Sequence, residues 1–399
     1  LNALDTDLFP KAVLFEDTGY TYYEYNVSSG LWEARLDLTM LAALIATSGS
    51  SLVTHTQSGT SHNLATYLQD RYVANVKDFG AVGDDSTDNT SAIGEWLDYL
   101  ISNDVTGYLP EGIFLTDYIS KAINSGIKII GTGTIKATGS NRVNMIRFTG
   151  VRGRVDIDGP TFDANDIVAR ALEIQNTSST SSTLGSVYIS PKTRFINAKN
   201  NAPDTNTAIG LYVYGGFSDV TFEGEIDTVN STSTTGAVSV GLLVSWSAIA
   251  TDDWVRSTTI TSAARIRNVK NDNTVLADAD GVQCLAPTSE VSIFSVAPGA
   301  LFENCKGRSI KSQVVGNSII APVIIRDAYN GLSEINLQYA GGKVFGAEVR
   351  HDGMRTDSII SIRWYYEFKQ VYDKLLKKYG PNIVYIKVKR EKHSIHLLN

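Results

Sequence analysis

The sequence predicts an all-β fold: a right-handed parallel β-helix (solenoid), with a small mixed N-terminal region before it and an α/β C-terminal segment after it. Two sets of repeated short strands and a scarcity of hairpin turns support this prediction. A solenoid stacks similar coils, so equivalent residues form rows along the stack.

The first set of repeats carries an asparagine at a fixed place. "TRFINAKN" (193–200), "ARIRNVKN" (264–271) and "ALFENCKG" (300–307) share an apolar residue, any residue, Asn, a small apolar residue and Lys. Asn adopts left-handed backbone angles readily, so we expect it to turn the strand and to stack on its equivalents. With two weaker copies included, the small apolar positions are Ala198, Val229, Val269, Cys305 and Ala328.

The second set of repeats alternates core and surface positions. It comprises "ALEIQ" (171–175), "GLYVY" (210–214), "GLLVS" (241–245), "GVQCL" (281–285) and "SIKSQ" (309–313). Alternation sends two rows inward: Leu172, Leu211, Leu242, Val282 and Ile310, and Ile174, Val213, Val244, Cys284 and Ser312. The row that faces outward is Glu173, Tyr212, Leu243, Gln283 and Lys311. A hairpin-built sandwich is the alternative, but the Asn-Gly and Asp-Gly turns that it needs are few.

Composition excludes several classes of function. The 399 residues are 43% hydrophobic and carry a net charge of -7, which is typical of a globular protein and unfavourable for nucleic acid or anionic membranes. No apolar run reaches membrane-spanning length. Two cysteines and five scattered histidines rule out a disulfide framework and a cysteine-based zinc site. No nucleotide-binding or nucleophile-elbow motif is present, and we expect no metal and no cofactor.

Changes in residue composition and hydrophobic pattern divide the chain into four segments. Residues 1–74 contain aromatic strand-like pieces and two helix-like runs, 36–47 and 61–72, and residues 75–110 read as a strand, a loop and a helix. Residues 111–356 are all-β in character. Residues 357–399 carry nine Lys/Arg against four Asp/Glu and read as an amphipathic helix (363–380) followed by a strand (382–389), of unclear role.

The strand, loop and helix of residues 75–110 suit the exposed end of a solenoid, because an uncovered sheet edge invites pairing with other chains. We expect Val76 and Phe79 to be inward residues of the strand, and Asp88 or Asn89 to cap the helix. The apolar face of the helix would cover the first coil through Ile93, Trp96, Leu97 and Leu100. The acidic residues Asp84, Asp85 and Asp88 are interpreted as turn and cap residues rather than metal ligands.

"VKDFGAVGDDSTDNTSAI" (76–93), followed by "GYLPEGIFL" (107–115), resembles the opening motif of the pectate-lyase-like superfamily, in the form that bacteriophage tailspike depolymerases carry. The usual pattern has Gly in place of Asp85 and often Asp in place of Asn89. The resemblance implies a homotrimeric β-helix in the virion tail, acting outside the cell on a bacterial surface polysaccharide. Residues 1–74 would then be the neck on the virion side, joined to the tail or baseplate.

Candidate site residues come from the outward row and from two short elements. "LADADGVQ" (276–283) resembles the Asn-Thr-Asp-Gly element of β-helical polygalacturonases, and "GRSIKSQ" (307–313) resembles their Arg-Ile-Lys element. Their paired-Asp and Gly-His-Gly elements are not recognisable. Glycoside hydrolysis needs two carboxyl groups, so the catalytic candidates are Asp280, Glu303, Asp278 and Glu173. The substrate-binding candidates are Tyr212, Tyr214, Gln283, Arg308, Lys311 and Trp254.

Three functions remain open on this scaffold. A glycoside hydrolase with a carboxylate pair is the leading hypothesis. A polysaccharide lyase would use Arg308 and Lys311 to neutralise a uronate carboxylate and Tyr212 as proton donor. A non-enzymatic adhesin would only bind the glycan. For each charged residue, the alternative is a surface ion pair between coils.

Overall fold

The computed structural model describes residues 73–139, 143–177, 183–201, 206–233, 238–247, 253–272, 279–287, 291–314 and 323–326 in full, and only backbone strands elsewhere. The chain divides into two compact units, Leu1–Tyr72 and Val73–Asn399. Among the described residues, no helix is long and apolar enough to cross a membrane.

The first unit contains two small antiparallel sheets. One consists of β1 (Lys11–Glu16), β2 (Gly19–Asn26) and β3 (Leu31–Asp37), and the other of β4 (Thr54–Gln57) and β5 (Thr60–Asn63). The predicted aromatic strands are β2 and β3. The helix-like runs begin inside β3 and β5, so the helix prediction is wrong for those first residues, and the rest of both runs lies outside the described residues.

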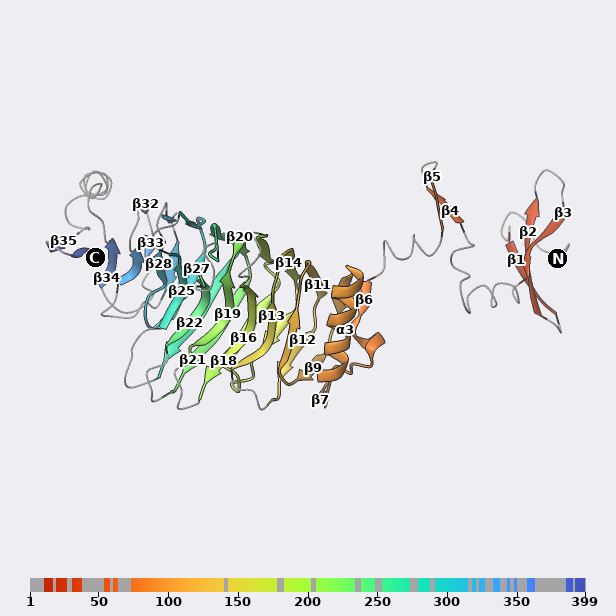
Figure 1. The fold of residues 1–399 in the computed structure, drawn as a ribbon, viewed down its shortest axis with the longest axis horizontal. Helices are drawn as coiled ribbons and strands as arrows, with labels where there is room; N and C mark the ends of the chain where they lie inside the picture. The colour runs from red at the N-terminus through yellow and green to blue at the C-terminus, as the bar shows by residue number, and fades with distance from the viewer. Residues whose placement is uncertain are drawn as a thin grey trace. The chain divides into compact units, whose positions relative to one another are not determined.

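The second unit is the predicted right-handed parallel β-helix, in which each coil adds one strand to each of three parallel sheets (Figure 1). The first sheet consists of β6 (Val73–Asn75), β8 (Thr106–Leu109), β11 (Ile127–Gly131), β14 (Arg154–Asp158), β17 (Gly185–Ile189), β20 (Phe217–Phe222), β23 (Ser257–Ile260), β26 (Ile293–Val296), β29 (Ser318–Ile320) and β32 (Lys343–Val344).

The second sheet consists of β7 (Asp84–Asp88), β9 (Ile113–Thr116), β12 (Thr134–Ala137), β15 (Thr161–Asp163), β18 (Arg194–Asn200), β21 (Glu225–Ser231), β24 (Arg265–Asn271), β27 (Leu301–Glu303), β30 (Ile324–Arg326) and β33 (Glu348–Val349). The third consists of β10 (Ile119–Ala122), β13 (Asn144–Thr149), β16 (Arg170–Asn176), β19 (Ala208–Gly215), β22 (Ser239–Ser245), β25 (Ala279–Leu285), β28 (Ile310–Gln313), β31 (Ser333–Leu337), β34 (Asp357–Ile362), β36 (Lys392–Leu398) and β35 (Tyr385–Lys389).

The rows predicted from alternation are confirmed by the strand register of the third sheet. Leu172, Leu211, Leu242, Val282 and Ile310 pair in succession, and so do Ile174, Val213, Val244, Cys284 and Ser312. All ten are buried. Aromatic residues fill the bore beneath the second sheet, where the rings of Phe162 and Phe195 stack with centroids 5.3 Å apart. The core is therefore one continuous apolar column along the solenoid axis.

The asparagine positions bend the chain within or directly after strands of the second sheet, as predicted. Asn197, Asn268 and Asn304 have φ of 59°, 55° and 53°, and Thr228 takes the same place with φ of 59°. The Asn304 Nδ2 donates to Asn268 Oδ1 at 2.7 Å, which stacks the two side chains on neighbouring coils. The small apolar residues that follow are in register, Ala198 with Val229 and Val229 with Val269.

The helix α3 (Thr90–Asn103) lies across the N-terminal end of the coils (Figure 1). Its predicted apolar face is buried, and the Trp96 Nε1 donates to the Ala74 carbonyl at 2.8 Å. Gly107 in β8 lies so close that an added Cβ would stand 2.4 Å from a Leu100 methyl. The predicted strand over Val76–Phe79 is wrong: these residues form the 3-10 helix η2 (Val76–Phe79), because Asn75 accepts the Lys77 N–H and the Gly80 N–H returns to Lys77.

The acidic loop before α3 is held by its own hydrogen bonds. The Asp84 carboxylate accepts the N–H groups of Thr87 and Ser86, and these bonds lower its pKa far below the usual value. Asp88 accepts the Thr90 N–H at 3.0 Å, whereas the Asn89 side chain bonds Val82 instead of the helix. Asp85, where the family pattern has Gly, has φ of 56°. The loop therefore uses a left-handed angle that Gly adopts without strain.

At the other end, the third sheet continues past residue 356. The strand β34 pairs in parallel with β31, and then β36 and β35 add antiparallel strands. The predicted strand of residues 382–389 corresponds to β35. The predicted helix of residues 363–380 lies outside the described residues.

Candidate functional site

The outward row predicted from the sequence is a physical row on the third sheet. Glu173 pairs with Tyr212, Tyr212 with Leu243, Leu243 with Gln283, and Gln283 with Lys311. The adjacent row pairs Gln175 with Tyr214 and Tyr214 with Ser245. These side chains lie on one flank of the solenoid because their core neighbours occupy the alternate positions.

Glu173 lies at the N-terminal end of this row and is tied to two arginines. Its carboxylate oxygens are 3.0 Å from Arg147 Nε and 2.6 Å from Arg170 Nη1, and the side chain is 4% exposed. The Arg170 guanidinium also lies 5.1 Å from the centre of the Tyr212 ring, which is 5.5 Å from the Tyr214 ring. Burial raises the pKa of Tyr212 to about 12, so this phenol is protonated at neutral pH.

Asp280 lies in β25, beside the outward row, and is held by a residue of the next coil. Its Oδ1 accepts from Arg308 Nε at 2.7 Å, its Oδ2 accepts from Arg308 Nη2 at 3.1 Å, and Lys311 Nζ is 3.9 Å away. Asp280 and Arg308 are both buried, at 2% and 9% exposure. A forked pair of hydrogen bonds of this kind fixes the orientation of the carboxylate. Asp278 lies outside the described residues.

The structure does not bring Glu173 and Asp280 together. Three strand spacings, about 14 Å, separate β16 from β25, and a catalytic carboxylate pair needs roughly 5–9.5 Å. The surface between the two is apolar, because Ile209, Val240 and Leu243 form a small cluster on this flank. The two carboxylates therefore belong to separate ion-pair groups.

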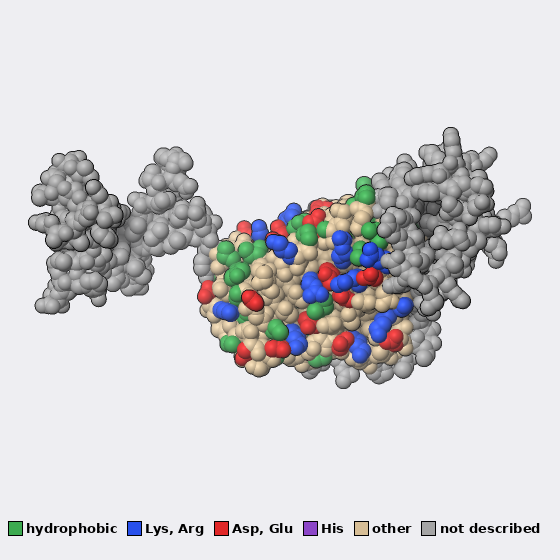
Figure 2. Space-filling view, turned by 180° about the vertical axis from the view of Figure 1, so that it is seen from behind, with side chains coloured by type: hydrophobic (Ala, Val, Ile, Leu, Met, Phe, Trp, Pro, Cys, Tyr) green, Lys and Arg blue, Asp and Glu red, His purple; other side chains and the backbone are tan. Residues whose placement is uncertain are grey.

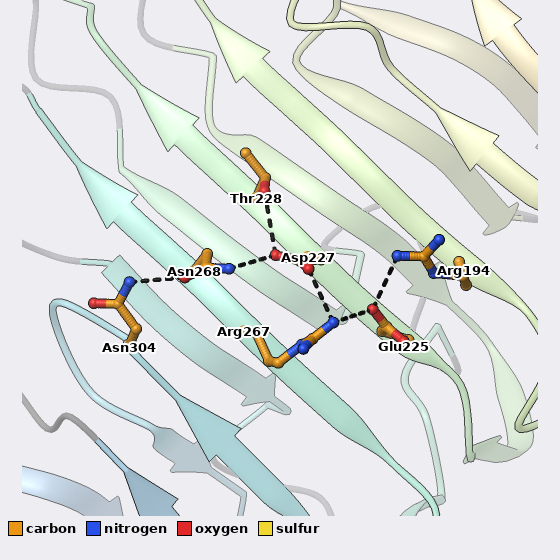
Figure 3. Close-up of polar contacts among 7 residues, drawn as sticks. All are labelled: Arg194, Glu225, Asp227, Thr228, Arg267, Asn268 and Asn304. Atoms are coloured by element: carbon orange, nitrogen blue, oxygen red, sulfur yellow. Dashed lines mark hydrogen bonds and ion pairs between the residues drawn. The ribbon is translucent and has the colours of Figure 1, made fainter. Parts of the chain in front are cut away.

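Glu303 lies on the second sheet, apart from the other candidates. It forms an ion pair with Arg326 at 3.7 Å, and it is in register with Arg267. Polar side chains on neighbouring strands of the second sheet contact one another and form a ladder (Figure 3). Its members are Arg194, Glu225, Asp227, Thr228, Arg267, Asn268 and Asn304.

The ladder links successive coils by alternating charges. Arg267 bonds both Glu225 and Asp227, and Asn268 donates to Asp227 at 2.6 Å. Burial opposes the charge of Arg267, but these two carboxylates outweigh it and raise its pKa. Figure 2, seen from the side opposite to Figure 1, shows acidic and basic side chains next to one another over the described surface. Compensated charges of this kind join strands and leave little free charge for a ligand.

Trp254 does not offer an open ring to a sugar. It is 8% exposed, and the Arg256 guanidinium lies 3.3 Å from its ring centre. Trp246, on the other side of the same loop, is 37% exposed.

Sequence reasoning missed a polar group on the first sheet. Tyr188 in β17 donates to Glu223 Oε2 at 2.8 Å. This bond, and the charges of Glu223, Asp156 and Asp158, raise the pKa of Tyr188 to about 12. Asp156 is in register with Tyr188, and Asp158 is two residues further along β14. The sequence signal that could have found this group is the alternation in "RVDID" and "VYI", which directs Asp156, Asp158 and Tyr188 outward. These stretches belong to neither of the two sets of repeats.

Two carboxylates, Asp158 and Glu223, lie on either side of the strand that carries Tyr188. Ile157 pairs with Ile189, and Ile189 pairs with Phe222, on three neighbouring strands. Asp158 follows Ile157 and Glu223 follows Phe222, so about two strand spacings, roughly 10 Å, separate the backbones of the two acidic residues. The Glu223 side chain reaches back one strand to accept a hydrogen bond from the Tyr188 hydroxyl. Among the described residues, no group of three or more His, Cys, Asp or Glu is arranged to hold a metal ion.

A model of the family described as "Rhamnogalacturonase A/epimerase, pectate lyase-like" matches residues 73–278. No curated protein matches the chain. Among solved structures, ORF18 of Geobacillus virus E2 is 14% identical with a TM-score of 0.36, over 86% of this chain and 73% of that one. The Dettilon tailspike protein (gp208) is 13% identical (TM-score 0.24, 90% and 81% covered), and the Agl-KA catalytic domain is 13% identical (TM-score 0.18, 70% and 68% covered). At these TM-scores, the three structures add no argument about function.

Proposed function

Because the chain belongs to the rhamnogalacturonase A/epimerase, pectate lyase-like family, we propose that it binds and depolymerises a bacterial surface polysaccharide, either capsule or O-antigen, as a phage tailspike. The tailspike part of the proposal rests on the opening motif of residues 76–93. In this proposal the chain is a homotrimer in the virion tail, attached through its N-terminal region, and it acts on the host surface.

The reaction that we propose is glycoside hydrolysis, and the observation that carries it is the carboxylate group around Tyr188. Asp158 and Glu223 lie on one half-buried flank, two strand spacings apart, and the carboxyl groups of an inverting hydrolase are roughly 6.5–9.5 Å apart to admit a water. Tyr188 stays protonated at neutral pH and its hydrogen bond holds Glu223 on this flank. One carboxyl group would protonate the leaving oxygen while the other activates water.

The candidate residues that the sequence analysis placed on the third sheet remain a second proposal for the site. Glu173 and Asp280 are each held by arginine side chains, and in this proposal they position neighbouring groups rather than transfer protons. Tyr212, Tyr214, Gln283 and Lys311 would contact glycan along the same flank. Asp278 and Glu303 stay candidates, and Asp278→Asn and Glu303→Gln in the same cleavage assay test them.

A polysaccharide lyase is the second candidate. The observation in its favour is the protonated Tyr212 beside Arg170, because a phenol can donate a proton to the leaving oxygen. Lyase products contain a double bond that absorbs ultraviolet light, and hydrolase products gain only a reducing end. This difference decides between the two reactions.

The test is incubation with a panel of purified capsules and O-antigens, followed by size-exclusion chromatography, a reducing-end assay and ultraviolet absorbance. We expect Asp158→Asn and Glu223→Gln to lose at least about a hundredfold in rate, as general acid–base groups do. Asp219→Asn, an outward residue of the same sheet, is the matched control and should keep the rate. If Asp280→Asn and Glu173→Gln abolish cleavage in fully folded protein while Glu223→Gln does not, the site lies on the third sheet. If no polysaccharide is shortened, the enzymatic proposal fails.

A further inference from the structure

Exposed large apolar side chains gather in two places among the fully described residues. Val73, Val82, Tyr99 and Tyr108 lie at the N-terminal end, in or beside α3 and the first strands. Trp246, Val291 and Ile293 lie where the chain passes from the third sheet to the first, with exposures of 37%, 68% and 44%. We call these three residues the corner patch.

Hydrogen bonds connect the chain segments that flank the corner patch. Trp246 directly follows β22, and the next residue, Ser247, donates its N–H to the Asp253 carbonyl at 2.9 Å, which ties the two ends of this loop. The adjoining Trp254 is buried under Arg256, and its Nε1 donates to the Val291 carbonyl at 3.4 Å. Trp254 therefore links the loop to the chain before β26, while the Trp246 side chain stays partly exposed.

The corner patch borders a row of hydroxyl groups that leads to Tyr188. Ile293 is followed two residues later by Ser295, which pairs with Thr259, and Thr259 pairs with Thr221, which pairs with Tyr188. The Thr259 and Ser295 hydroxyls are 3.2 Å apart. Three strand spacings, about 14 Å, therefore separate Tyr188 from Ser295 along the first sheet.

We propose that the corner patch is a sugar-binding subsite, with Trp246 as the surface on which a pyranose ring stacks. This inference rests on the proposed function and adds a subsite remote from the cleaved bond. A pyranose presents C–H groups on its face and hydroxyls at its rim, and an aromatic face is electron-rich and attracts such polarised hydrogens. The neighbouring Ser and Thr hydroxyls are suited to the rim. Three side chains are too few for a protein interface, which needs about 800 Å² from each partner.

The test is the affinity of Trp246→Ala for each polysaccharide of the capsule and O-antigen panel, measured by gel retardation in the presence of that polysaccharide. Loss of the exposed indole surface is expected to weaken binding about tenfold. Trp246→Phe should retain most of the affinity because the ring is kept. Tyr99→Ala is the matched control, since Tyr99 is also 37% exposed but lies in the N-terminal group, and it should bind like wild type.

Three results would overturn the subsite. Equal affinity of Trp246→Ala and wild type, with cleavage intact, removes the subsite and leaves the proposed function standing. A change of molar mass in Trp246→Ala by light scattering, without a change in affinity, assigns the corner patch to a contact between copies of the chain. If wild type neither binds nor shortens any polysaccharide of the panel, the subsite falls together with the proposed function.

Discussion

Replacing Asp280 by Asn separates a structural role from a catalytic one. Asp280 is 2% exposed and Arg308 9% exposed, and the two make a forked ion pair between neighbouring coils. Removing one partner of a buried pair typically costs about 3–5 kcal/mol, because the other charge stays buried. Asn can still accept one hydrogen bond from Arg308, so we expect a loss near the lower end, about 3 kcal/mol in the free energy of unfolding.

The measurement is urea unfolding followed by circular dichroism, with Asp98→Asn as the control. Asp98 forms an ion pair of similar length with Lys121, 2.6 Å, but its side chain is 60% exposed, so its loss should cost less than about 1 kcal/mol. Combining Asp280→Asn with Arg308→Gln should recover part of the loss, because the buried guanidinium charge is then removed together with its carboxylate partner. The reasoning is refuted if Asp280→Asn is as stable as Asp98→Asn. If Asp280→Asn keeps its stability but no longer cleaves polysaccharide, Asp280 acts on the substrate.

Three further predictions follow from single residues. Asn268→Ala should lower the free energy of unfolding by about 1–3 kcal/mol, because Ala tolerates φ of 55° poorly and cannot make the hydrogen bond to Asp227. Asn268→Gly should recover the part of this loss that comes from backbone strain. Urea unfolding measures both variants. Asp85→Gly should leave stability unchanged or raise it by up to about 1 kcal/mol, and a clear fall in Tm would contradict the argument from φ. The raised pKa of Tyr188 stabilises the folded chain fully below pH 10, and this contribution disappears as the pH rises toward about 12, so wild type should lose more stability than Tyr188→Phe above pH 10.

The core of the fold could be predicted from the sequence because alternation leaves a clear trace. Leu211, Leu242 and Val282 repeat at strand spacing, and Asn268 and Asn304 repeat at the turn, so register followed from superposed repeats. The conformation of Val76–Phe79 could not be read this way, since four residues fit a strand or a 3-10 turn equally well. Capping by the Asn75 side chain decided between them.

The candidate site was only partly predictable. Alternation correctly placed Glu173 and Lys311 in one outward row, but it carries no information about which charges find partners. The sequence distance between Asp280 and Arg308 concealed that the next coil brings them together. Tyr188 and Glu223 are 35 residues apart in chain order, and no repeat relates them. Ion pairs and hydrogen bonds between coils depend on how far and in which direction each side chain extends. The alternation of residues along a strand does not predict this.

A crystal structure of Glu223→Gln with an oligosaccharide product of the cleaved polysaccharide tests the central claim most directly. We expect sugar density along the first sheet, with the reacting linkage between Asp158 and residue 223 and a ring on Trp246. Density along the third sheet instead, beside Glu173 and Tyr212, would contradict the assignment of the cleavage site.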